Sequence, residues 1–212
     1  AATPSLDALR AKGAFIPASR GVMPSMSAPN WSTLLTSVGP SVHGIHSNQW
    51  WWFRWTRYLE YPTLFTALKR SKQSGAQTAA VYEWKHFGRL WDPKDVDFTA
   101  FSPNSEETIE HVRRALASRP RLMVIHLVGI DRAGHQYGWG SDEYDKAVTR
   151  VDAQVGSIVD ILREQGLLKD SLLVVVSDHG GAGRGHGGDS DMERQTPAIL
   201  YGRTVKPEAM MD

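Results

Sequence analysis

The sequence predicts an α/β protein, a three-layer α/β/α sandwich with a central, mainly parallel sheet. Two near-continuous apolar runs support this prediction, "RLMVIHLVGID" at 121–131 and "LLVVV" at 172–176. Such runs suit strands that are buried on both faces. A long amphipathic pattern separates them, and a helical crossover of that length joins parallel strands. The chain has 212 residues, which suits one well-buried domain spanning 1–212.

Two helices are expected near the start of the chain. "TPSLDALRAKG" has Thr3 as N-cap, Pro4 at the first helical position and Gly13 as the C-terminal stop. "APNWSTLLTS" at 28–37 predicts the second helix, and Ser27 is the expected N-cap of that helix.

The next elements have equally local signals. "YPTLFTALKRS" at 61–71 predicts a helix, and "QTAAVYEW" at 77–84 predicts a strand. A further helix is expected over 107–117, because Asn104 and Glu107 have the spacing of a capping box.

The second half of the chain is more regular. A helix capped by Ser141 and ending at Gly166 has apolar residues at the spacing of one buried stripe, namely Tyr144, Val148, Val151, Val155, Ile158 and Leu162. "SLLVVVSDHG" at 171–180 and "TPAILYG" at 196–202 are the expected strands that follow it.

Composition excludes several classes of partner and site. The net charge is +1, from 24 basic and 23 acidic residues, which gives no reason to expect a nucleic-acid polymer as partner. There is no cysteine, so any metal must be held by His, Asp, Glu or a hydroxyl. The longest apolar runs are too short to cross a bilayer.

Ligand-type side chains gather where the two apolar runs end. "DRAGH" supplies Asp131 and His135, four residues apart across an expected turn at Gly134, and "SDHGGAGRGHGG" supplies a further set, Asp178, His179 and His186. The carboxyl ends of parallel strands meet at one edge of a sheet, where ligands bind. Two carboxylates and three imidazoles exceed the needs of one tetrahedral ion, so we expect two cations in one site. Glycine lets the loop turn back tightly.

Simpler interpretations stay open for some of these residues. Asp131 fits a helix-capping acid beside a bystander histidine, and Ser27 fits a helix cap with no further role. Three other histidines, His86, His111 and His126, are expected to be surface or satisfied polar residues. The loop also matches G-x-G-x-x-G, but no helix follows it directly, which argues against a dinucleotide site.

Three segments taken in order, "MSAPNWSTLLTSVGPSVHGIHSN", "GIDRAGHQYG" and "SDHGGAGRGHGG", resemble the alkaline phosphatase superfamily. The resemblance is greatest to its type I phosphodiesterase and nucleotide pyrophosphatase branch. It implies an alkaline phosphatase-like fold and an enzyme that hydrolyses phosphodiesters or pyrophosphates through a phosphoseryl intermediate. The implied substrate is a small phosphate ester or a nucleotide, and the implied location is the periplasm or the outside of the cell.

The same resemblance implies roles for individual residues. Ser27 matches the nucleophile, and Asn48 matches the asparagine that binds a phosphoryl oxygen. Two zinc ions are implied, with manganese as an alternative. One ion would be held by Asp131, His135 and His186, and the other by Asp178, His179 and Ser27.

Alternatives remain within the superfamily and outside it. A phosphomonoesterase, a phosphonate hydrolase and a phosphoethanolamine-handling relative are the other enzymes considered, and a catalytically incomplete metal-binding remnant is the non-enzyme alternative. A formylglycine-dependent sulfatase is disfavoured, because Trp31 occupies the position where that motif has arginine.

Two features depart from the family pattern. The family takes one more aspartate for its second zinc from a strand that precedes "TPSLDAL", and its chains continue beyond "GRTVKPEAMMD". We therefore expect a fragment of a longer protein, with a missing central strand and a weak second metal site.

The segment "NQWWWFRWTRY" at 48–58 concentrates four of the eight tryptophans. It would suit a wall on which a nucleobase or aryl group stacks, with Arg54 or Arg57 near phosphate. It would equally suit the core of a small flap, since large aromatic side chains serve mainly to fill space.

Overall fold

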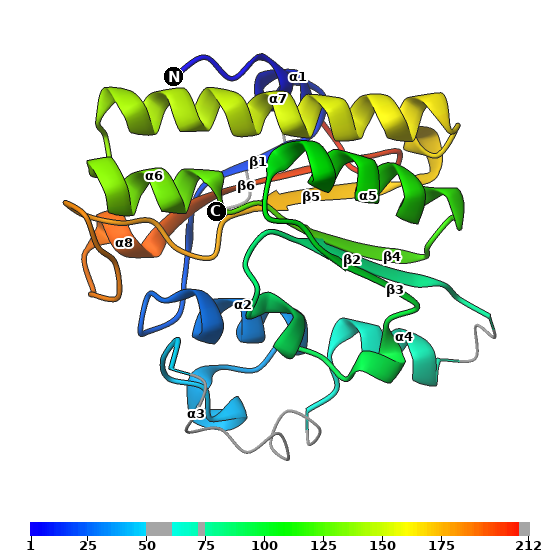
Figure 1. The fold of residues 1–212 in the computed structure, drawn as a ribbon, viewed down its shortest axis with the longest axis horizontal. Coiled ribbons are helices and arrows are strands. Elements are labelled where there is room, and N and C mark those ends of the chain that lie inside the picture. The colour runs from blue at the N-terminus through cyan, green and yellow to red at the C-terminus, as the bar shows by residue number, and fades with distance from the viewer. Residues whose placement is uncertain (50–60, 72–74, 208–212) are drawn as a thin grey trace. The chain divides into compact units, whose positions relative to one another are not determined.

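The computed structural model describes residues 1–49, 61–71 and 75–207 (Figure 1). Contacts between Cα atoms divide the chain into two compact units. One unit, here the terminal unit, combines residues 1–21 with 128–212, and the other, the middle unit, spans 22–127. The chain therefore leaves the terminal unit once and returns to it once.

The terminal unit contains a three-stranded sheet in the order β1-β6-β5. Its strands are β1 (Ala14–Arg20), β5 (Leu172–Val176) and β6 (Gln195–Gly202), and both pairings are antiparallel. Leu200 of the central strand lies opposite Ala14 on one side and Val174 on the other. The expected parallel arrangement is wrong here, because β5 and β6 are joined by a loop and one four-residue helix instead of a helical crossover.

Three longer helices belong to the terminal unit, α1 (Pro4–Lys12), α6 (Gly129–Tyr137) and α7 (Asp142–Glu164), with the short α8 (Asp191–Arg194) after them. The predicted ends of the first and third are confirmed within two residues, with Thr3 and Ser141 at the N-caps. In Figure 1, α7 runs beside α1. A buried carboxylate fixes this packing, because Asp152 of α7 accepts the backbone N–H groups of Ser5 at 3.0 Å and Leu6 at 2.8 Å.

The middle unit contains a parallel sheet in the order β3-β2-β4. Its strands are β2 (Thr78–Tyr82), β3 (Phe98–Phe101) and β4 (Leu122–His126). Helix α5 (Ser105–Ala117) is the crossover from β3 to β4, and Asn104 caps it as predicted by accepting the N–H of Glu107 at 3.0 Å.

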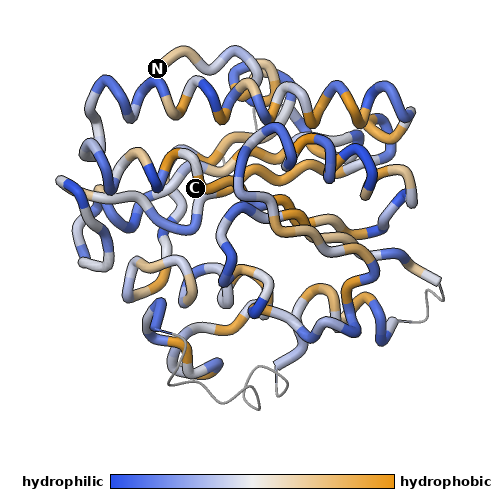
Figure 2. The backbone as a smooth tube through the Cα atoms, in the orientation of Figure 1, coloured by the Kyte–Doolittle hydropathy of each residue, from blue (hydrophilic) through white to orange (hydrophobic). Residues whose placement is uncertain are grey.

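The core of the middle unit is aromatic. Helices α2 (Ser27–Thr36), α3 (Pro40–His43) and α4 (Leu64–Arg70) belong to this unit, and the 3₁₀ turns η2 (Phe87–Arg89) and η3 (Pro93–Asp95) follow β2. Phe65 and Phe87 are fully buried, and Trp91 packs edge-on against both, at ring centroid distances of 5.3 and 5.4 Å. Apolar residues run along the strands of both sheets in Figure 2.

The predicted single central sheet is not what the described residues form, since they form one antiparallel and one parallel sheet. The terminal 3₁₀ turn η4 (Leu168–Asp170) leads into β5, whose Leu172 and Val174 are 58% and 54% exposed. The prediction that this strand is buried on both faces is therefore wrong for the described residues, because β5 is an edge strand there. Along the described ranges, no helix is both long and apolar enough to span a membrane.

Candidate active site

Asp131 and His135 lie on helix α6, one turn apart. The expected turn at Gly134 is wrong, because Gly134 is a buried residue within that helix. Side chains four residues apart share one face of a helix, so both ligand-type groups point the same way. Asp131 lies in the first turn, where the helix dipole favours a carboxylate.

The loop between β5 and α8 carries the other ligand-type residues, Asp178, His179 and His186. Its path needs glycine at two positions, because Gly183 and Gly187 have φ angles of +58° and +119°. The loop also folds back on itself, with Ala182 and Gly185 joined by reciprocal backbone hydrogen bonds of 2.9 and 3.1 Å.

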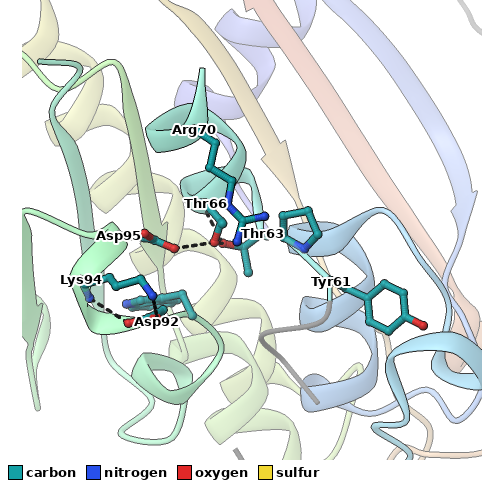
Figure 3. Close-up of a pocket in the computed structure, with 9 residues that line it drawn as sticks. Tyr61, Thr63, Thr66, Arg70, Asp92, Lys94 and Asp95 are labelled. Atoms are coloured by element: carbon teal, nitrogen blue, oxygen red, sulfur yellow. Dashed lines mark hydrogen bonds and ion pairs between the residues drawn. The ribbon is translucent and has the colours of Figure 1, made fainter. Parts of the chain in front are cut away.

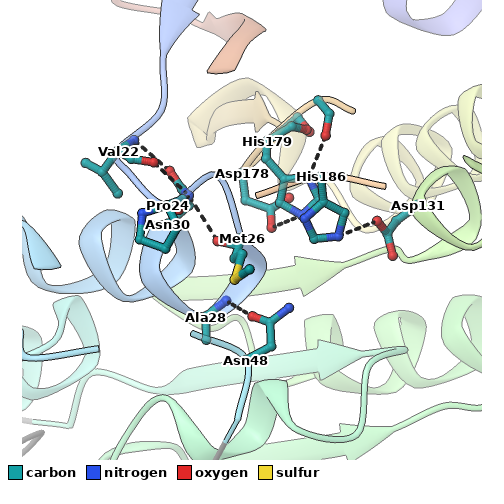
Figure 4. A network of polar contacts seen from close by, with 12 residues as sticks. Val22, Pro24, Met26, Ala28, Asn30, Asn48, Asp131, Asp178, His179 and His186 are labelled. Atoms are coloured by element: carbon teal, nitrogen blue, oxygen red, sulfur yellow. Dashed lines mark hydrogen bonds and ion pairs between the residues drawn. The ribbon is translucent and has the colours of Figure 1, made fainter. Parts of the chain in front are cut away.

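Three ligand atoms from α6 and this loop converge. Nε2 of His135 lies 3.1 Å from Nε2 of His186, and Oδ1 of Asp131 lies 3.6 Å from each of them. All three atoms fall within 4.8 Å of one another. Figure 4 shows His186 directed at Asp131. We refer to these three side chains as the metal group.

The chemistry of the metal group fits a divalent cation. Nδ1 of His135 donates to the backbone carbonyl of Arg184 at 3.0 Å, which leaves the lone pair of Nε2 facing the group. Oδ1 of Asp131 is buried and has no hydrogen-bond partner among the residues that the structure describes. A buried carboxylate oxygen without a donor is costly, and a bound cation would supply the missing charge.

Asp178 and His179 lie next to the metal group. Their Oδ2 and Nε2 atoms are 3.3 Å apart, and Nδ1 of His179 donates to the carbonyl of Gly180 at 2.8 Å. The imidazole of His179 stacks on that of His186, with ring centroids 3.8 Å apart. The five predicted ligand side chains of the terminal unit therefore lie together, as a group of three and an adjoining pair.

Ser27 is the first residue of helix α2 in the middle unit. The prediction that Ser27 is the N-cap is wrong by one residue, because Met26 occupies that position and makes no side-chain cap. A residue outside the helix supplies the acceptor for its first turn, since Oδ1 of Asn48 accepts the N–H of Ala28 at 2.8 Å (Figure 4). Ser27 and Asn48 thus lie at one helix N-terminus, where partial positive charge accumulates.

Asn30 organises the chain that leads into this helix, a role that was not predicted from the sequence. Its Oδ1 accepts the N–H of Val22 at 2.8 Å, and its Nδ2 lies within 3.3 Å of three carbonyl oxygens, those of Val22, Pro24 and Met26. The side chain is buried, with 4% exposure for the residue. Only the position of an asparagine in the first turn of a helix could have suggested this.

The remaining histidines differ in their surroundings. His126 is buried, which excludes the surface alternative of its prediction, and its ring lies against those of Phe87 and Trp31 at 4.5 and 5.4 Å. His43, which the sequence did not single out, is also buried, and its Nδ1 accepts the N–H of Ile45 at 3.1 Å. Burial lowers the pKa of His43 and is also the largest cause of the lowered pKa of His86.

A small cavity of about 90 Å³ opens in the middle unit (Figure 3). Most charged groups that line the cavity bind other lining residues, since Lys94 forms an ion pair with Asp92 at 2.7 Å and Thr66 donates to Asp95 at 2.6 Å. Its lining includes neither Ser27 nor Asn48. The predicted tryptophan wall, with Arg54 and Arg57, lies mostly at positions 50–60, outside the described residues.

The fold and the metal group together define an α/β protein with three side chains that could hold a metal ion. The family model "Type I phosphodiesterase / nucleotide pyrophosphatase" matches residues 1–184, and the chain belongs to this family. The match includes Ser27, Asn48 and the "SDHG" segment, and it ends two residues before His186.

Curated relatives include human ectonucleotide pyrophosphatase/phosphodiesterase family member 1, which is 28% identical over 200 residues. That alignment covers 84% of this chain and 21% of the relative, so the chain spans about a fifth of its length. The catalytic subunit of human GPI ethanolamine phosphate transferase 3 is 34% identical over 85 residues, which cover 40% of this chain and 7% of that protein.

Solved structures resemble the fold at low sequence identity. An inactive variant of murine ectonucleotide pyrophosphatase/phosphodiesterase 5, in complex with AMP, matches with a TM-score of 0.72 and 19% identity over 84% of this chain and 52% of that one. A 2-O GAG sulfatase matches with a TM-score of 0.70 and 14% identity over 98% of this chain and 60% of the other. Both matches concern the fold.

Proposed function

We propose that this chain carries a zinc-dependent phosphodiesterase or nucleotide pyrophosphatase site that acts through a phosphoseryl intermediate. The observation that carries the proposal is the metal group, in which two imidazole nitrogens and an unpartnered carboxylate oxygen lie within 4.8 Å of one another. Membership of the phosphodiesterase family supports the reaction class. The proposed substrate is a small phosphate ester or a nucleotide.

The metal group would hold one zinc ion, and Asp178 with His179 would contribute to a second. When bound, two such cations lower the pKa of a hydroxyl and neutralise the charge that develops on phosphoryl oxygens. The loop prepares the imidazoles for this task, because the carbonyls of Arg184 and Gly180 each accept a ring N–H and leave the opposite nitrogen as a ligand. With only two residues, the second group is the weaker site.

Ser27 would be the nucleophile and Asn48 a donor to the substrate. In the first step, the Ser27 hydroxyl loses its proton and its Oγ forms a bond to phosphorus, while the leaving oxygen takes the electron pair of its P–O bond and gains a proton to depart as an alcohol. In the second step, water loses a proton as its oxygen bonds to phosphorus, and the bond to Oγ breaks and returns Ser27 to a hydroxyl. Because Oδ1 of Asn48 is held by the N–H of Ala28, its amide nitrogen is left to donate to a phosphoryl oxygen.

A transferase is the second candidate. The local similarity to an ethanolamine phosphate transferase favours it, since transfer differs from hydrolysis only in the second step. There an acceptor alcohol, instead of water, would take the phosphoryl group from Ser27. Phosphomonoester and phosphonate hydrolysis remain predictions that rest on the resemblance alone, as does location in the periplasm or outside the cell.

The complete fold is part of the proposal. We propose that residues 1–212 belong to one catalytic domain, because the chain leaves the terminal unit after residue 21 and re-enters it at residue 128.

Hydrolysis of bis-p-nitrophenyl phosphate with added zinc tests the activity. We expect release of p-nitrophenol by the unaltered chain and none above background by Ser27→Ala. Incubation with a fluorescent alcohol as acceptor would reveal transfer, since the labelled phosphodiester would accumulate.

Ser157→Ala is the matched control, because Ser157 is an exposed serine on α7. Hydrolysis that persists unchanged in Ser27→Ala would remove the covalent mechanism. Zinc-independent hydrolysis would remove the metal role.

A further inference from the structure

Trp139 joins the two segments that supply the metal group. It follows Gly138, the C-cap residue of α6, and its backbone N–H donates to the carbonyl of Gly183 at 2.8 Å. Gly183 belongs to the loop that carries His186. The backbone of Trp139 therefore ties the end of the helix that bears Asp131 to that loop.

The indole of Trp139 also fills space that two glycines leave open. A Cβ atom at Gly134 of α6 would lie 2.6 Å from Cε2 of the indole, and one at Gly181 of the loop would lie 2.2 Å from the same atom. Real Cβ atoms do not approach other heavy atoms so closely. The indole thus packs directly against the backbone of α6 and of the loop, because each has a glycine at the point of contact.

The same ring touches both imidazole ligands. The ring of His135 stands edge-on to the indole at a centroid distance of 5.3 Å and an angle of 87°, and that of His186 at 6.0 Å and 71°. The two imidazoles are themselves 4.9 Å apart. Edge-to-face contacts favour particular ring orientations, so the indole limits how each imidazole can rotate.

We propose that Trp139 is a positioning residue that holds His135 and His186 at the separation and orientation of two ligands to one cation. The inference rests on the proposed metal role of these histidines. A tetrahedral zinc site needs ligand nitrogens at about 2.0–2.1 Å with defined angles, so side chains that are held in place before binding give tighter sites. His135 has particular need of support, because its side chain is 48% exposed.

Zinc affinity, measured by chelator competition, tests this role. We expect Trp139→Leu to lower zinc affinity about 10- to 100-fold, the range for loss of a residue that supports a ligand. Trp139→Phe keeps an aromatic ring and should restore much of the affinity. Trp91→Leu is the matched control, since Trp91 is a buried tryptophan of the middle unit, and it should lower stability while leaving zinc affinity unchanged.

A double-mutant cycle separates positioning from simple space filling. Gly181→Ala should weaken zinc binding in the unaltered chain, because its new methyl group displaces the indole. In the Trp139→Leu background the same substitution should have little further effect. Additive losses would overturn the inference, as would equal zinc affinity in Trp139→Leu and the unaltered chain.

The metal-free protein gives an independent test by ¹⁵N NMR of the histidine rings. We expect the His135 ring to carry its proton on Nδ1, as the contact with the Arg184 carbonyl requires, and to lose this preference in Trp139→Leu. An unaltered tautomer in the variant would overturn the positioning role. If the unaltered chain bound no zinc, the proposed function would fail, and the tautomer would still decide whether Trp139 orients His135.

Discussion

The metal group and the first turn of α2 differ in how their polar atoms are satisfied. Around α2, the side-chain amide of Asn30 hydrogen-bonds to the backbone through both its oxygen and its nitrogen, and Oδ1 of Asn48 accepts the N–H of Ala28. In the metal group, two imidazole nitrogens face each other at 3.1 Å, and Oδ1 of Asp131 has no hydrogen-bond partner in the described part of the chain. The first region satisfies its polar atoms internally, whereas the second leaves one carboxylate oxygen without a hydrogen-bond donor among the described residues.

This difference indicates different tasks. Internal hydrogen bonds fix a backbone, so the first turn of α2 offers a preformed helix N-terminus. In the metal group, a buried carboxylate oxygen without a hydrogen-bond donor is costly in the folded chain, and a bound cation would offset that cost. Substitutions should therefore have opposite effects on stability in the two regions, and the following experiments test that contrast.

The largest effect is expected from Asp131→Asn. Loss of the carboxylate should abolish zinc-dependent hydrolysis and lower zinc affinity by more than about 100-fold, beyond the range for a supporting residue. The metal-free variant should be as stable as the unaltered chain or more stable, because a neutral amide can donate to a facing imidazole. Chelator competition and thermal unfolding in EDTA measure these two quantities.

Asp170→Asn is the control for this experiment, as Asp170 is an exposed acid of the same unit. A marked loss of stability in metal-free Asp131→Asn would contradict the view that the carboxylate is held there for a ligand.

Asn48→Asp should separate the two functions of Asn48. An aspartate keeps the oxygen that accepts from Ala28, and a carboxylate is favoured at a helix N-terminus, so stability should be retained. The amide donor is lost, so kcat for bis-p-nitrophenyl phosphate should fall about 100-fold or more. Asn48→Ala removes both groups and should also cost about 1 kcal/mol of stability. Equal kcat in Asn48→Asp and the unaltered chain would remove the donor role.

Asn30→Ala should lower the free energy of unfolding by about 2 kcal/mol, because it leaves several backbone groups without their partner. Urea denaturation monitored by circular dichroism would measure the change. Asn104→Ala removes an exposed helix cap in the same unit and should cost about half as much. If Asn30→Ala cost less than Asn104→Ala, the buried amide would not be the element that fixes this turn.

The smallest effect concerns pH. Burial lowers the pKa of His43 in the folded chain below its ordinary value of 6.5, so the unfolded chain binds more protons between the two values. The contribution of neutral His43 to stability is therefore complete above about pH 6.5 and declines as the pH falls from there through the folded pKa. His43→Gln should reduce this dependence in thermal unfolding between pH 7.5 and 5. Identical pH profiles would contradict it.

Local signals in the sequence were sufficient for most helices. Asn104 and Ser141 cap helices with their side chains where the spacing indicated, and Thr3 occupies the predicted N-cap position without a side-chain bond, because helix ends depend on a few neighbouring residues. The sheets were harder to predict. An apolar run such as 172–176 suits a central parallel strand or an edge strand paired antiparallel, and only the pairing with β6 distinguishes them.

The candidate site shows the same division. The ligand residue types and their order along the chain were enough to predict that Asp131, His135 and His186 gather, which the geometry bears out. The sequence did not reveal Trp139 or Asn30, because their roles depend on contacts with distant segments. Nothing in the sequence pairs Trp139 with Gly181, which lies 42 positions away, or Asn30 with the backbone carbonyl of Val22.

The pairing of β1 with β6 has a consequence for biosynthesis. Strand β6 is the only partner of β1 in the described sheet, and Ala14 cannot pair until Leu200 has left the ribosome, long after β1 itself. Contacts so distant in sequence form slowly, so nascent β1 stays exposed while the middle segment folds. Premature termination before Gln195 would leave β1 and β5 with no strand to join them, a product suited to chaperone capture and degradation.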